Sequence, residues 1–148
     1  MVIKQLSVFI ENREGRLEQV TEALKEHNIN IASFSLADTS EYGMLRMIVS
    51  DPEKGRKVLK EEGFSAMLTD VIAVKIAQKP GTLHDVLRLL YDTKLSVEYM
   101  YTLATAGKDT SVIMKVSNLE IALKLLDLKG YEVCTAKEAY EINNYVDK

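Results

Sequence analysis

The stretch LSVFIENREGRL at residues 6–17 returns in altered form as IAVKIAQKPGTL at residues 72–83. Each version begins with apolar residues at every second position, which is typical of a half-buried β-strand. Each then passes through a polar loop with a glycine, Gly15 or Gly81, into apolar residues at helical spacing. The order strand, loop, helix therefore occurs twice in a chain of 148 residues.

The match extends far beyond these two stretches. After one inserted residue the offset changes from 66 to 67 positions, and apolar residues, a serine and a glycine continue to coincide. The later pairs are Leu45 with Val112, Met47 with Met114, Val49 with Val116, Ser50 with Ser117, Leu59 with Leu126 and Gly63 with Gly130. Agreement in one register with a single gap indicates an internal repeat.

Further signals complete the same order of elements in each copy. A second strand is predicted to begin at residues 30–31 and at residues 96–97. A second helix is predicted to start where Asp51, or Asn118 in the other copy, can cap it, and to end before the matched glycine. Short fourth strands are predicted at residues 64–68 and 131–135.

This order predicts an α+β fold: two ferredoxin-like βαββαβ units in tandem, each an antiparallel sheet with its helices on one face. We expect one domain at residues 1–69 and a second at residues 70–148, with a short C-terminal extension. Only residues 69–70 are expected to separate the last strand of one copy from the first strand of the next. A connection this short predicts copies that pack against each other.

The charge and the apolar pattern exclude several classes of protein. A net charge of −3 disfavours binding to nucleic acid, which needs clustered Lys and Arg. No stretch approaches a membrane span, and the first residues do not form a signal peptide, so we expect a cytoplasmic protein. Cys134 is the only cysteine, and neither histidine has a second ligand at helical spacing, so we expect no metal and no cofactor.

Apolar residues outside the expected cores predict a further contact. The strand positions that alternate with the core positions form a mixed face, which indicates partial cover by another surface. These positions are Ser7, Phe9, Met44, Arg46, Ile48, Ala73, Lys75, Ser111, Ile113 and Lys115, with Tyr99 and Tyr101. The predicted helix at residues 119–128 is apolar on more than one face. Both features favour a homodimer.

Three functions were weighed for this fold. RNA binding would need exposed aromatic residues on the central strands and a basic surround, and both are lacking. Catalysis would need a nucleophile and base in a recognisable pattern, which the chain does not offer. Binding of a small molecule suits the glycine loops, because the backbone amides at a helix N-terminus attract an anion such as a carboxylate.

The loops also resemble those of the ACT domain, a regulatory module of enzymes of amino-acid metabolism. The resemblance rests on the match of residues 12–17 and 79–83 to its strand–turn–helix signature and on the Asn-Ile step at residues 30–31. It covers both copies. It implies an effector held between paired domains by Asn12 and Asn30, with Gln78 and Ser96 at the corresponding positions of the second copy.

The resemblance implies a set of ligand-binding residues around these four. In the first copy they are Asn12, Glu14, Gly15, Arg16, Leu17, Asn30 and Ile31. In the second copy they are Gln78, Gly81, Thr82, Leu83 and Ser96. Because the two copies differ at these positions, we expect one competent site, built mainly from the first copy.

The function implied is that of a non-catalytic regulator. The chain would bind an amino acid and control a metabolic enzyme carried on another chain. The alternative is a regulatory subunit or scaffold that acts through protein contact alone, without a ligand.

Overall fold

The computed structural model describes residues 2–38, 41–103 and 109–141 and divides the chain into two compact units. The first unit holds Lys4–Thr69 and the second holds Asp70–Ala139. The residues next to these ranges belong to the opposite unit: Ile3 groups with the second unit and Tyr140 with the first.

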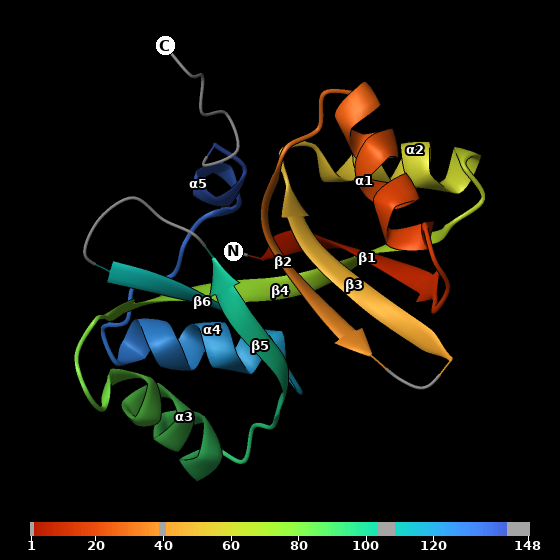
Figure 1. Ribbon diagram of the computed structural model, residues 1–148. Helices are drawn as coiled ribbons and strands as arrows, with labels where there is room; N and C mark the ends of the chain where they lie inside the picture. The colour runs from red at the N-terminus through yellow and green to blue at the C-terminus, as the bar shows by residue number, and fades with distance from the viewer. Residues whose placement is uncertain (1, 39–40, 104–108, 142–148) are drawn as a thin grey trace. The chain divides into compact units, whose positions relative to one another are not determined.

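The first unit has the predicted order of elements. They are β1 (Ile3–Glu11), α1 (Arg16–Glu26), β2 (Ile31–Asp38), β3 (Tyr42–Val49), α2 (Pro52–Glu61) and the start of β4 (Ser65–Ala77). The strands lie in the order β2-β3-β1-β4, and β3 is antiparallel to both β1 and β2. Both helices lie on one face of this sheet (Figure 1). The ferredoxin-like prediction is confirmed.

The second unit repeats this order. The rest of β4 is followed by α3 (Thr82–Asp92), β5 (Val97–Leu103), β6 (Asp109–Val116), α4 (Leu119–Leu128) and a short helix α5 (Ala136–Glu141). The strand order is β4-β6-β5, with antiparallel pairs. The predicted fourth strand at residues 131–135 is reduced to a single bridge between Val74 and Val133.

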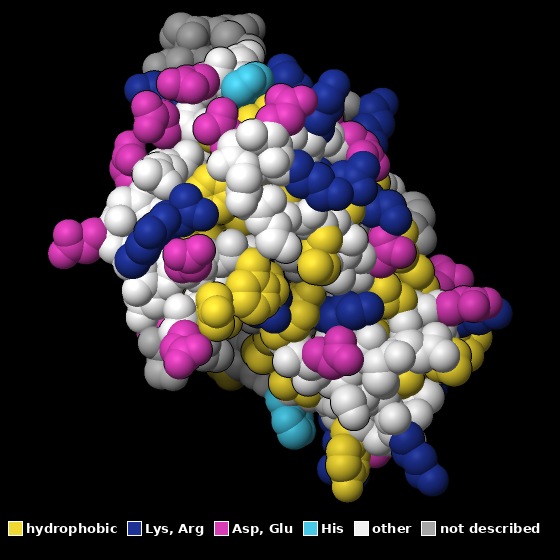
Figure 2. Space-filling view, turned by 90° about the vertical axis from the view of Figure 1, so that its right-hand side faces the viewer, with side chains coloured by type: hydrophobic (Ala, Val, Ile, Leu, Met, Phe, Trp, Pro, Cys, Tyr) yellow, Lys and Arg dark blue, Asp and Glu magenta, His cyan; other side chains and the backbone are white. Residues whose placement is uncertain are grey.

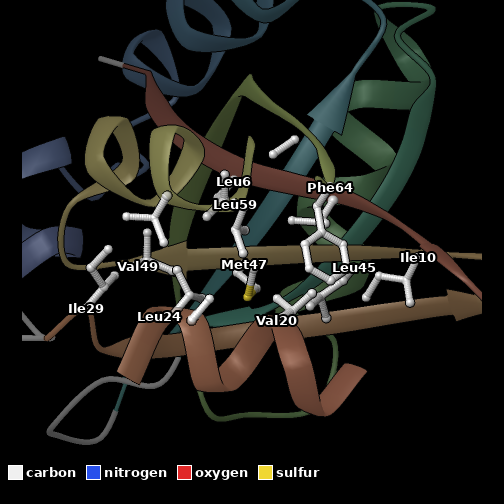
Figure 3. Close-up of a cluster of buried hydrophobic side chains, with 14 residues drawn as sticks. Leu6, Ile10, Val20, Leu24, Ile29, Leu45, Met47, Val49, Leu59 and Phe64 are labelled. Carbon is white, nitrogen blue, oxygen red and sulfur yellow. The ribbon is translucent and has the colours of Figure 1, made fainter. Parts of the chain in front are cut away.

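The helix-facing residues of the strands form the cores. Leu6, Val8, Met47 and Leu59 are buried in the first core, and Figure 3 shows how such side chains from strands and helices point toward one another. Helical spacing in the sequence predicts that Leu17 is buried with Val20 and Leu24, and this is wrong, because Leu17 is 42% exposed. Leu17 lies in the first turn of α1, and the residues that this helix buries are Val20, Ala23 and Leu24.

The connection between the copies also differs from the prediction. Instead of two strands separated by residues 69–70, β4 is one strand of 13 residues that serves both units. The cause is local: the chain has neither Gly nor Pro at this point, and Thr69 is β-branched, so nothing ends the extended conformation.

The strand face turned away from the helices is partly covered, as its mixed composition predicts. Ser7, Ile48, Ala73 and Ile113 are buried on this face, whereas Phe9 is 43% exposed. The buried polar groups are hydrogen-bonded to one another: Gln5 donates to Ser7 Oγ over 3.0 Å, and Ser7 Oγ lies 3.1 Å from Thr69 Oγ1. Paired in this way, they avoid the cost of burying an unsatisfied polar group.

Close packing of α2 on β1 leads to a prediction about matched positions in the two copies. A Cβ on Gly55 would lie 2.9 Å from Leu6 Cδ2, and Leu6 is fully buried. The corresponding residue of the second copy is Ala122, which is also buried. We expect Gly55→Ala to destabilise the first unit by about 1 kcal/mol, because overpacking outweighs the gain in helix propensity.

The reverse change tests the same reasoning. Ala122→Gly should also destabilise, by about 1 kcal/mol or more, because it removes a packed methyl group and adds backbone freedom. Urea unfolding measures both changes. A stabilising effect of Gly55→Ala would show that Leu6 yields without cost.

Candidate functional site

The loop between β1 and α1 is shaped by Gly15. Its φ of 83° lies in the left-handed region, which favours glycine, while the space around its missing side chain is open. Gly81 has the same role before α3, with φ of 89°. Backbone conformation, rather than lack of room for a side chain, therefore explains both glycines.

The two helices that follow these glycines, α1 and α3, begin differently from α2 and α4. Asp51 and Asn118 cap α2 and α4, accepting hydrogen bonds from the amides of Lys54 and Ile121 over 3.2 and 3.1 Å. No side chain among the described residues caps α1 or α3. The first amide of each helix donates to its own loop, from Arg16 N to Arg13 O and from Thr82 N to Lys79 O, each over 3.4 Å. The amides that follow in the first turn are the ones open to an external acceptor, and the helix dipole favours an anionic one.

Arg16 distinguishes the first loop from the second. Its guanidinium lies over the Phe64 ring, 4.2 Å from the centroid, and its Nη1 donates to Gln19 Oε1 over 3.0 Å. Its Nε atom is buried and has no hydrogen-bond partner within the described part of the chain. A buried donor without an acceptor is costly, as is a cation at a helix N-terminus. An anion bound at this loop would relieve both.

The other predicted residues of this loop are exposed. The backbone amide of Asn12 donates to Glu41 O over 3.0 Å, which ties the loop to the β2–β3 connection. The side chains of Asn12, Glu14 and Leu17 lie at the surface. They can therefore meet a ligand without any rearrangement of the core.

Asn30 and Ile31 lie at the other end of the sheet. Asn30 is held at the end of β3 by two hydrogen bonds with Ser50, from Asn30 N to Ser50 Oγ and from Ser50 N to Asn30 O, each 3.0 Å long. Ile31 pairs with Val49 and packs against the first core. Ser96 and Ser117 repeat this arrangement in the second unit.

One unit therefore does not bring Asn12 and Asn30 together. Ile10 pairs with Gly43 near one end of β3, whereas Ile31 pairs with Val49 at the other. Since a strand rises about 3.3 Å per residue, roughly 20 Å separates these ends. The physical reason is the crossover between β1 and β2. Because these strands run in the same direction, the last residue of β1 and the first residue of β2 lie at opposite ends of the sheet.

The second loop uses its polar groups internally. Thr82 Oγ1 donates to Ala77 O over 2.7 Å, and Gln78 Nε2 donates to the hydroxyl of Thr110. Leu83 packs against the second core, and Ser96 is exposed. Of the two loops, only the first combines an uncapped helix with a buried donor that has no partner in the described residues.

Sequence reasoning missed three neighbours of the site. Phe64 and Gln19 hold the guanidinium of Arg16, and Ser50 holds Asn30. The match of Ser50 with Ser117 in the repeat was a signal for the last of these. Contacts of Arg16 with Phe64 join residues far apart in the chain, and no local pattern indicates them.

The surface that the structure describes carries mixed charge on the face in view and no group of metal ligands. Basic and acidic side chains are intermixed over the face in Figure 2. In the described ranges, no three residues among His, Cys, Asp and Glu are grouped so that they could hold a metal ion. Nor does any described helix have the length and apolar character to cross a membrane.

The hydrogen bonds of Thr82 predict a structural role for this residue. Thr82→Val should destabilise the second unit by about 1 kcal/mol, because Ala77 O loses its hydroxyl donor. Urea unfolding measures the loss. The same variant should bind any ligand of the first loop with unchanged affinity, and weakened binding would instead give Thr82 a ligand-binding role.

Comparison with known proteins agrees with this architecture. A family model described as an ACT domain pair matches residues 1–142. Protein BT0572 from Bacteroides thetaiotaomicron has a similar structure, with 38% identity, a TM-score of 0.90 and coverage of 95% of this chain and 97% of that one. No curated protein matches the sequence.

More distant similarity supports the fold alone. The regulatory subunit of aspartate kinase from Thermus thermophilus, in a ligand-free form, has 19% identity and a TM-score of 0.64, with 87% of this chain and 94% of that chain covered. The corresponding subunit from Thermus flavus has 21% identity and a TM-score of 0.59, with 84% and 90% covered. The match over residues 1–142 shows that this chain belongs to the ACT domain pair family.

Proposed function

We propose that this protein is a cytoplasmic, non-catalytic regulator that binds an amino acid at the β1–α1 loop of its first unit and controls an enzyme of amino-acid metabolism. The observation that carries the proposal is the buried Nε of Arg16, which lacks an acceptor among the described residues beside an uncapped helix. Both features suit the carboxylate of an amino acid. Membership of the ACT family supports the regulatory role.

Each part of the loop has a role in this proposal. The amides of Leu17 and Glu18 in the first turn of α1 and the guanidinium of Arg16 bind the ligand carboxylate. Gly15 allows the backbone to turn close to the ligand. The amide side chain of Asn12 offers both a donor and an acceptor, which suits the charged ends of an amino acid.

The role of Asn30 requires a second copy of the chain. β2 lies at the edge of the first unit's sheet, and Phe34 and Leu36 on it are 68% and 49% exposed. Apart from Asp38 at its end, β2 carries no charge, and an edge strand with so little protective charge is prone to pair with another strand. In an antiparallel pair of β2 strands, Asn30 of one chain would lie at the sheet end that carries Asn12 of its partner. A homodimer would thus unite the two asparagines.

Thermal denaturation in the presence of each of the twenty amino acids tests ligand binding. A ligand at 100 times its Kd should stabilise the folded chain by about 2.7 kcal/mol. Arg16→Met keeps an aliphatic chain over Phe64 and should weaken binding about tenfold, as loss of a charge-assisted hydrogen bond does. Asn12→Ala should also weaken it.

The matched control lies in the second loop. Gln78→Ala replaces the residue that corresponds to Asn12 and should leave binding unchanged. If no amino acid stabilises the protein, the proposal of a ligand fails, and regulation through protein contact alone becomes the better account.

The dimer is tested separately at the β2 edge. Phe34→Lys should convert the dimer to a monomer at micromolar concentration, measured by light scattering, because a charge replaces an apolar contact. Met100→Lys is the control, since Met100 has the corresponding position on β5 and is 42% exposed. A monomeric parent chain would contradict the homodimer.

A further inference from the structure

Residues 131–138 of the second unit, called the strap here, are weakly attached to the sheet. They follow α4 and run along the edge of β4 opposite β6. Lys75 N donates to Glu132 O, and Cys134 N donates to Ala73 O, each over 2.8 Å. The matching residues of the first unit lead into the 13-residue strand β4 instead.

Charge supplies a second attachment. Lys75 Nζ lies 2.9 Å from a carboxylate oxygen of Glu138 and 3.2 Å from one of Glu132. The hydrogen bond from Lys75 lowers the pKa of Glu138, and hydrogen bonds to Glu138 and then Glu132 raise the pKa of Lys75. The groups are therefore oppositely charged at neutral pH.

Glu138 also closes a capping box at the start of α5. Its amide donates to Thr135 Oγ1 over 3.0 Å, and the Thr135 amide donates to Glu138 Oε1 over 3.4 Å. One carboxylate thus connects Lys75 on the sheet with the turn that carries Cys134. Cys134 itself is 1% exposed, and burial raises the pKa of its thiol.

Tyr131 and Val133 of the strap pack against the second core, while another side of the strap borders a hollow at the surface. This hollow of about 560 Å³ is lined by Leu123 and Asp127 of α4 and by Tyr131, Val133 and Glu138 of the strap, among others. Among the described residues a single β-bridge, at Val133, joins the strap to β4, and a segment held by so short a ladder has low local stability.

We propose that the strap opens as a local unit while both cores stay folded, and that Lys75 holds it closed. Opening frees the backbone edge of β4 at Ala73 and Lys75 and exposes Cys134. This conformational device is independent of the ligand proposed for the first unit. Substitutions at the strap therefore leave the binding at Arg16 unchanged.

Alkylation of the full chain by iodoacetamide tests the proposal. Cys134 is the only cysteine, so the rate reports on this segment alone. In native conditions the rate should be insensitive to low urea, which is the sign of a local opening that exposes little surface. Lys75→Met should raise the rate about fivefold, through the loss of two partly exposed ion pairs.

Two further variants test whether the ion pair of Lys75 with Glu138, rather than the loss of any surface ion pair, holds the strap closed. Glu138→Gln keeps the capping box, because glutamine also serves there, but removes the charge, and it should raise the rate as Lys75→Met does. Lys124→Met removes an exposed ion pair with Glu120 on α4 and should leave the rate unchanged.

Two results would overturn the proposal. One is an alkylation rate that rises with urea as steeply as global unfolding does, since Cys134 would then be reached only by unfolding. The other is an unchanged alkylation rate in both Lys75→Met and Glu138→Gln, which would show that Lys75 does not hold the strap closed.

Discussion

Packing of alternate strand residues against two helices is the constraint on which each unit depends. Leu6, Val8 and Met47 face the helices in the first unit, and Ile72, Val74 and Met114 do so in the second. A shift of one residue in either sheet would turn these side chains to the opposite face. The registers of β1 with β3 and of β4 with β6 hold them in place.

The two copies share this core but differ where the chain meets solvent. Gly55 of the first core corresponds to Ala122 of the second, and both are buried, while the loops before α1 and α3 share a left-handed glycine. The first loop then places a guanidinium beside the helix start, whereas the second uses a hydroxyl to bind its own carbonyl groups. Duplication has therefore kept the architecture and changed the chemistry of one turn.

The strap shows a second divergence between the copies. In the first unit the matching segment is the start of β4, which continues without a break into the second unit. The second unit ends in a short bridged segment, where Lys75 and Glu138 supply much of the attachment. Equivalent positions of a repeat thus differ in local stability because the chain continues differently from each.

The sequence by itself determined the repeat, the ferredoxin-like order of elements, the capped starts of α2 and α4 and the glycine turns, because each depends on residues close together in the chain. It did not reveal that β4 is continuous, that Leu17 is exposed, or that Ile3 and Tyr140 group with the opposite units. Only the tertiary structure decided where the predicted site residues lie. It separated Asn12 from Asn30 and placed Arg16 on Phe64, because strand direction and long-range contacts set those distances.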